Sequence, residues 1–169
     1  MSFIGKKIHG LLNRPSKRKN KADHISFENA STIGILFTWT NQRSLEEIET
    51  FISEVQGIKE VKALCYNPTK EALDINFPMV NLTDLSGLGK LNSDDANQFT
   101  KTKFDFLFHL DFELNEITQS ILSNSEAKCR VGIHSQEGEP YYELMIGINQ
   151  NAGLSNFAHQ ILKYVKEIK

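Results

Sequence analysis

Short runs rich in β-branched and aromatic residues recur along most of the chain, and amphipathic segments separate several of them. Runs of this length and composition predict buried strands. They fall at residues 32–39, 61–66, 104–110, 129–133 and 142–148.

Three longer segments carry apolar residues at helical spacing. Ser44 opens the first, and Glu47 three residues later predicts a capping box, with Gly57 as the end of that helix. The second helix is expected over residues 113–123, and the last begins at Asn151 or Ser155 and continues to residue 168. Residues 67–103 are the least regular part, with a short apolar run at 79–82 and a Ser-Asp-Asp cap signal at 93–95.

Strands that alternate with helices predict a three-layer α/β domain. We expect residues 30–169 to form a single Rossmann-like or flavodoxin-like domain, with a mostly parallel sheet of about five strands. Ligands of such sheets bind beyond the carboxyl ends of the strands, so residues at those ends are the candidates for a site.

Residues 1–24 are expected to form a separate basic arm and linker. Ile4, Ile8, Leu11 and Leu12 recur at i, i+4, i+7 and i+8, with Phe3 at the edge of the stripe. This spacing predicts an N-terminal amphipathic helix that ends before Pro15. The polar run that follows is expected to be a solvated linker.

Charge is distributed unevenly between this arm and the rest of the chain. The first 22 residues hold seven of the 19 Lys and Arg residues and no acidic residue, whereas the other 147 carry 12 basic against 21 acidic residues. The seven are Lys6, Lys7, Arg14, Lys17, Arg18, Lys19 and Lys21. We therefore expect an anionic partner.

Two partners fit this arm, and both remain open. The apolar stripe favours an anionic membrane surface, and the dense basic run favours RNA or a ribonucleoprotein. The alternatives are that the helix docks on its own domain, or that the arm mediates self-association. The expected function is a non-enzymatic adaptor or binding module whose α/β body contacts protein.

Several common classes of protein are not indicated. No apolar run approaches the length of a transmembrane helix, and the N-terminus lacks the features of a secretory signal. The expected location is the cytoplasm, either free or peripheral to the inner membrane. Cys65 and Cys129 are expected to be reduced core thiols, and no residue spacing suggests a metal or cofactor.

A possible ligand edge comprises Thr40, Asn41 and Arg43, after the first strand, and His109 and Asp111, after a later one. The turn lacks the glycines of a dinucleotide site, but a helix N-terminus there can bind an anion. Alternation places the last two on one side of their strand, and a histidine beside a carboxylate is the minimum for acid–base chemistry.

Each of these residues also has a structural interpretation. Thr40 and Asn41 can hydrogen-bond to backbone groups of the loop while Ser44 caps the helix. His109 can hydrogen-bond to loop backbone, and Asp111 can cap a helix. Asp105 shares the side of His109 but lies near the start of its strand, and His134 follows another strand. No nucleophile motif is present, so we assign no catalytic residue and do not expect an enzyme.

Three stretches resemble a known group of proteins. These are FDFLFHLDFELNEITQSILSNSEAKCRVGIHS, the later YYELMI, and the terminal KYVKEI. Together they resemble an uncharacterised bacterial family of small Rossmann-like proteins with a basic N-terminal helix. The resemblance covers residues 5–168 and implies the fold but no activity.

The first of these stretches is also locally similar to the N-terminal half of heptosyltransferase-type glycosyltransferases. This similarity implies an alternative function, an enzyme or degenerate enzyme related to the acceptor half of such transferases. Those enzymes need a second Rossmann domain, and they carry their catalytic acid in the first strand–helix loop. This chain has Thr40-Asn41-Gln42 in that loop, so only the half-domain fold carries over.

Overall fold

The computed structural model describes residues 25–57 and 59–168. The expected N-terminal helix, its apolar stripe and the basic run therefore lie outside the described residues. No helix of the described part is long and apolar enough to span a membrane.

The centre of the molecule is a six-stranded parallel sheet in the order β3-β2-β1-β4-β5-β6. This is the strand order of the Rossmann fold, so the predicted fold class is confirmed. The strands are β1 Thr32–Thr38, β2 Glu60–Asn67, β3 Met79–Asn81, β4 Phe106–His109, β5 Cys129–Ile133 and β6 Leu144–Ile146. The strand beyond the expected five is β3, which forms from the short apolar run at 79–82.

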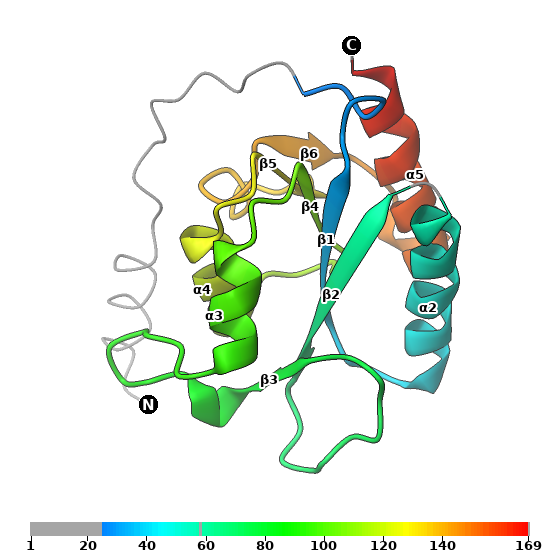
Figure 1. Cartoon of the computed structure of the whole chain (residues 1–169). Coiled ribbons are helices and arrows are strands. Elements are labelled where there is room, and N and C mark those ends of the chain that lie inside the picture. The colour runs from blue at the N-terminus through cyan, green and yellow to red at the C-terminus, as the bar shows by residue number, and fades with distance from the viewer. Residues whose placement is uncertain (1–24, 58, 169) are drawn as a thin grey trace.

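Helices cover both faces of this sheet (Figure 1). Helices α2 and α5 pack together on one face, and α3 and α4 pack together on the other. Their bounds are α2 Gln42–Gln56, α3 Asp94–Lys101, α4 Glu116–Asn124 and α5 Leu154–Glu167, with 3-10 turns η1 Leu82–Asp84 and η2 Gln150–Ala152.

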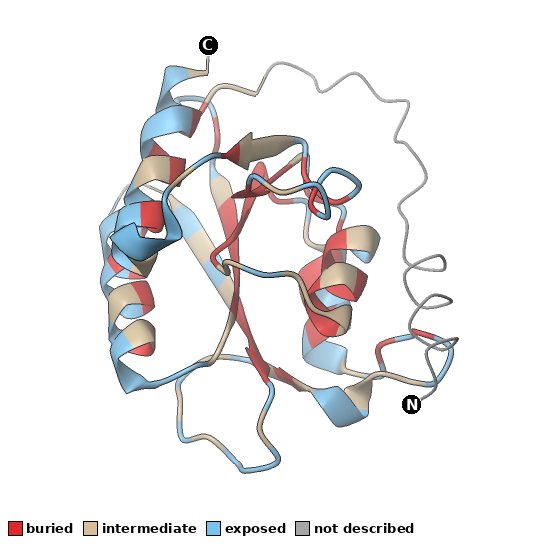
Figure 2. Ribbon diagram, turned by 180° about the vertical axis from the view of Figure 1, so that it is seen from behind, coloured by how far each residue is buried: buried red, intermediate tan, exposed pale blue. Residues whose placement is uncertain are grey.

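The two faces of the sheet carry two hydrophobic clusters, and buried residues line the strands and the inner sides of the helices (Figure 2). The apolar face predicted for α2 is buried as expected, at Leu45, Ile48, Phe51, Ile52 and Val55. Phe27 and Ala30 are also buried and belong to the same cluster.

Three helix starts differ from the predictions. Helix α2 begins at Gln42, and the side chain of Asn41 accepts the N–H of Ser44, so the predicted Ser44 cap is wrong. Helix α4 begins after Asn115 rather than at residue 113. Helix α5 follows Gly153 instead of Asn151 or Ser155, because residues 150–152 form η2. Ser93 caps α3 as the sequence predicts.

Both cysteines are free thiols, Cys65 fully buried and Cys129 partly buried. Burial raises the pKa of each thiol to about 12. They therefore stay protonated at neutral pH and behave as core residues, as expected.

Candidate functional site

The sheet has one topological switch point, between β1 and β4. The crossover from β1 leads to β2 on one side, and the crossover from β4 leads to β5 on the other. Connections that leave in opposite directions open a crevice beyond the carboxyl ends of the two strands. Thr38 ends β1 there, and Asp111 follows β4 by two residues.

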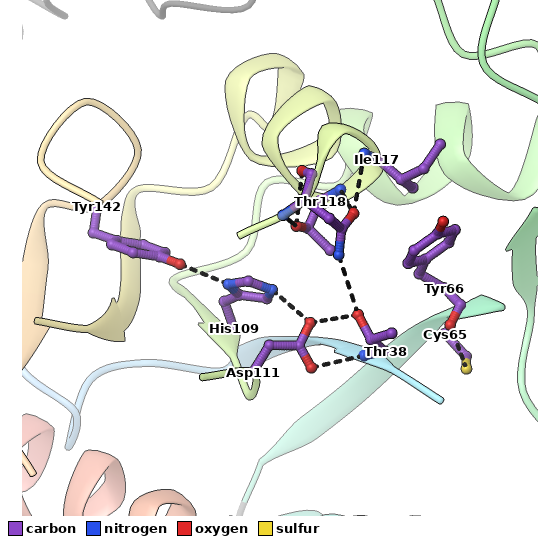
Figure 3. A network of polar contacts seen from close by, with 9 residues as sticks. Thr38, Cys65, Tyr66, His109, Asp111, Ile117, Thr118 and Tyr142 are labelled. Atoms are coloured by element: carbon purple, nitrogen blue, oxygen red, sulfur yellow. Dashed lines mark hydrogen bonds and ion pairs between the residues drawn. The ribbon is translucent and has the colours of Figure 1, made fainter. Parts of the chain in front are cut away.

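A chain of hydrogen bonds crosses the sheet at this edge (Figure 3). The Tyr142 hydroxyl lies 2.6 Å from His109 Nδ1, and His109 Nε2 lies 2.9 Å from Asp111 Oδ2. Thr38 then donates its backbone N–H to Asp111 Oδ1 at 2.8 Å and its hydroxyl to Oδ2 at 2.6 Å. We call this chain of four residues the Tyr–His–Asp–Thr relay.

The groups on either side of His109 indicate which atoms of the relay carry protons. Burial, and to a lesser degree the charge of Asp111, raises the pKa of Tyr142, so the tyrosine keeps its proton and its hydroxyl can donate to His109 Nδ1. Because a carboxylate accepts hydrogen bonds, we assign the tautomer in which His109 donates Nε2–H to Asp111. Both nitrogens of this fully buried histidine are thus used inside the protein.

Local sequence explains how Tyr142 reaches His109. A Cβ on Gly132 of β5 would collide with the Tyr142 ring, so glycine at this position leaves the space that the ring occupies. Arg130, buried in the same strand, fixes the chain next to Tyr142, because its Nε lies 3.0 Å from Glu143 Oε2. Its Nη1 also donates to the Leu122 carbonyl at 2.8 Å. The Arg130–Glu143 pair is thus part of the framework of the relay.

A cavity of about 490 Å³ lies at the switch point, beyond the Asp111 carboxylate. Its polar lining comes from Thr38, Thr40, Ser44, Asp111, Glu113, Asn115 and Gln150. Its apolar lining comes from Leu110, Phe112, Leu114 and Leu154. The Asp111 side chain is 11% exposed, whereas that of His109 is 0% exposed and is not part of the lining.

The structure brings together only part of the predicted ligand edge. Thr40 and Asp111 line the cavity, and the predicted His109–Asp111 contact exists. Asn41 is used as the cap of α2. Arg43 is 89% exposed and pairs with Glu47 at 3.4 Å, so it does not line the cavity.

The other two candidates lie elsewhere. His134 is exposed and is not part of the cavity lining. Asp105 lies at the amino edge of the sheet, where its carboxylate accepts the Ser31 and Thr32 N–H groups and pairs with Lys128 at 2.6 Å. Burial opposes its ionisation, but Lys128 and the two N–H groups outweigh burial and lower the pKa of Asp105 to about 2.

Sequence reasoning did not find Tyr142, Thr38 or Asn115. Asn115 caps α4 and also donates to the Thr38 hydroxyl at 3.4 Å. The sequence could have indicated the capping role of Asn115, because an asparagine directly before a helical segment is a strong N-cap. Among the described residues, no group of three or more His, Cys, Asp and Glu side chains has the arrangement of a metal site.

A comparison with known families matches the model of a family of unknown function to residues 2–168. No curated protein and no solved structure matches the chain.

Proposed function

Since the chain belongs to DUF6913, a family of unknown function, we propose its function from the charge distribution and geometry of this protein alone. We propose a non-enzymatic binding module. Residues 1–22 bind an anionic partner, and the α/β domain contacts protein.

The separation of charge along the chain carries this proposal. Seven basic and no acidic residues in the first 22 contrast with 12 basic and 21 acidic residues in the other 147. Lys and Arg at such density bind phosphates, either of RNA or of lipid headgroups, and the affinity falls with salt.

Two lysines of the folded domain lie where the arm joins it. The Nζ atoms of Lys59 and Lys166 lie 5.1 Å and 5.7 Å from the centre of the Phe27 ring. Both distances are within the range of cation–π contacts. These lysines add positive charge only locally, because each is followed directly in the sequence by an exposed acidic residue, Glu60 and Glu167 respectively.

The buried state of His109 supports the non-enzymatic part of the proposal. Its side chain is 0% exposed and both ring nitrogens have partners, so it cannot touch a ligand in the cavity without moving. A general acid or base must come within hydrogen-bond reach of the group on which it acts. In this arrangement His109 positions Asp111 instead.

The anionic partner is either RNA, alone or in a ribonucleoprotein, or an anionic membrane surface. Binding to phosphates of RNA depends on the basic side chains alone. Binding to a membrane also needs the apolar stripe, because an in-plane helix buries its apolar face among the lipids. Two arm variants of the full-length protein therefore separate these partners.

The first variant changes Lys17, Arg18, Lys19 and Lys21 to Gln, and the second combines Ile8→Ser with Leu11→Ser. Each is titrated with a single-stranded RNA and with phosphatidylglycerol vesicles over a range of salt concentrations. If RNA is the partner, the first variant lowers the salt slope of log K by about 3 and the second binds as wild type does. If a membrane is the partner, both variants lose binding to vesicles.

A matched control changes four exposed lysines of the folded domain, Lys70, Lys90, Lys101 and Lys103, to Gln. It removes the same charge outside the arm, so it should bind both partners nearly as well as wild type. Wild-type protein that binds neither RNA nor vesicles at low salt would contradict the proposal and favour docking of the arm on its own domain.

The alternative, an enzyme or degenerate enzyme related to the acceptor half of a glycosyltransferase, draws support from one observation. Asp111 lines a cavity at the switch point, where ligands of such sheets bind. Turnover of a sugar donor that Asp111→Ala abolishes in a folded protein would favour this alternative over the binding module.

A further inference from the structure

We infer that the cavity between β1 and β4 binds a small organic ligand that carries a cationic amine, with the Asp111 carboxylate as its anchor. This site is separate from the arm and goes beyond the function proposed above. Three features of the cavity support it: an unused acceptor position on Asp111, the sign of the charges in the lining, and an apolar wall.

Asp111 has capacity for one more hydrogen bond. A carboxylate offers about four lone-pair positions. Three donors use three of them, namely the Thr38 N–H on Oδ1 and the Thr38 hydroxyl and His109 Nε2–H on Oδ2. The remaining position is on Oδ1, and the side chain lines the cavity, so a ligand that donates a hydrogen bond fits there.

The lining charges select for a positive ligand. Asp111 and Glu113 are the two ionisable residues among the lining residues, and both are acidic. Arg43, the basic residue close by in sequence, pairs with Glu47 away from the lining. A phosphate or carboxylate group would meet two negative charges without a countercharge, whereas an ammonium would be attracted to both.

The rest of the cavity suits a ligand with an apolar body. Leu110, Phe112, Leu114 and Leu154 form one part of its lining. The Phe112 ring stacks on buried Phe157 of α5 at 5.6 Å between ring centres, so this wall is fixed to the core. A volume of about 490 Å³ lies within the range of sites for small molecules.

Tyr142 and His109 affect this site indirectly, through the Asp111 carboxylate. They do not line the cavity, but His109 holds Asp111 Oδ2 and Tyr142 holds the ring of His109. They are therefore positioning residues, which keep the free side of the carboxylate directed toward the ligand. An anchor fixed in advance costs less ordering on binding than a mobile side chain does.

The test uses three amines of increasing size, namely benzylamine, phenethylamine and tryptamine, each with the alcohol and the carboxylate of closest matching skeleton. Each compound is titrated into the full-length 15N-labelled protein while backbone amide shifts are followed. The amines should saturate with millimolar affinity, with shifts centred on the cavity-lining residues. The alcohols should bind at least about tenfold more weakly, and the carboxylates should not saturate.

Variants assign the effect to the cavity. Glu113 is exposed, so Glu113→Gln should fold normally and weaken amine binding several-fold, while Glu49→Gln on the exposed side of α2 should not change it. Thr40→Trp, at an exposed lining position, should block all binding by filling the mouth. Alcohols or carboxylates that bind as tightly as the amines, or amines that shift no lining residue, would overturn the inference.

Discussion

At the scale of single residues, two aspartates six positions apart have different roles because they lie at opposite edges of the sheet. Asp105 is at the amino edge and joins the start of β1 to Lys128. Asp111 is at the carboxyl edge, where it lines the cavity and joins His109 to Thr38 in the relay. The sequence alternation placed both on one side of the strand but could not show which partners each would meet.

Asp105→Asn should reveal a pH-dependent contribution to stability. The pKa of this carboxyl is about 2 in the folded protein, against an ordinary value of 3.8. A lowered pKa stabilises the fold above the ordinary value, and this contribution is lost as the pH falls from about 4 to about 2. The variant should lose about 1–2 kcal/mol at pH 7 in urea unfolding, and the difference from wild type should shrink below pH 4.

The control for this experiment is Asp74→Asn, in an exposed loop, which should change the free energy of unfolding by less than about 0.5 kcal/mol. If the gap between wild type and Asp105→Asn were the same at pH 7 and pH 3, the ionised form of Asp105 would not be the stabilising one.

Tyr142→Phe should destabilise the protein through the relay. The change removes the donor to His109 Nδ1 and leaves that buried nitrogen without a partner. An unsatisfied buried polar atom costs about 1–3 kcal/mol, which urea unfolding can measure. Tyr164→Phe, at a residue that is 43% exposed, is the matched control and should cost much less. Equal stability of the two variants would argue against the relay.

At the scale of elements, strand β5 affects the site through Gly132, because the ring of Tyr142 occupies the space that a side chain at this position would fill. Gly132→Ala would place a methyl group into the Tyr142 ring and should cost about 1–3 kcal/mol from overpacking. Gly147→Ala is the control, because nothing lies within 4 Å of the added Cβ. In a Tyr142→Leu background the cost of Gly132→Ala should fall, since the two changes share one contact.

The sequence predicted helices and strands correctly where the hydrophobic pattern extends over several residues. It missed features that depend on a single residue, such as the exact start of a helix. The strands β1, β2, β4 and β5 and the buried face of α2 follow from their patterns. The start of α2 was misplaced because Asn41 and Ser44 are both good caps, and the backbone of Asn41 is the one that is extended. The strand β3 has three residues, too few for a period to show.

The candidate site was predictable only in part for a similar reason. His109 and Asp111 are two residues apart, so strand alternation brings them together. Tyr142 is 33 positions from His109, and its contact depends on how residues 134–143 return along β5. A local sequence pattern does not show how such a connecting segment folds back on a strand. Arg43 looked suitable from sequence, but it lies on the exposed side of α2.

At the scale of the whole molecule, the cavity and the start of the described chain lie at opposite edges of the sheet. The cavity lies at the carboxyl ends of β1 and β4, whereas residues 25–31 precede β1 at its amino end, beside the end of α5 (Figure 1). Because the two proposals rest on different residues, loss of the arm should leave the cavity unchanged, and loss of the cavity should leave binding by the arm unchanged.

Capture from native lysate, with full-length protein and with protein lacking residues 1–22, tests directly whether the arm binds the anionic partner. Full-length protein should retain RNA or anionic lipid at low salt and release it at high salt, and the shortened protein should retain neither. The charge control in the folded domain, with Lys70, Lys90, Lys101 and Lys103 changed to Gln, should behave as full-length protein does. Equal retention with and without the arm would contradict the account.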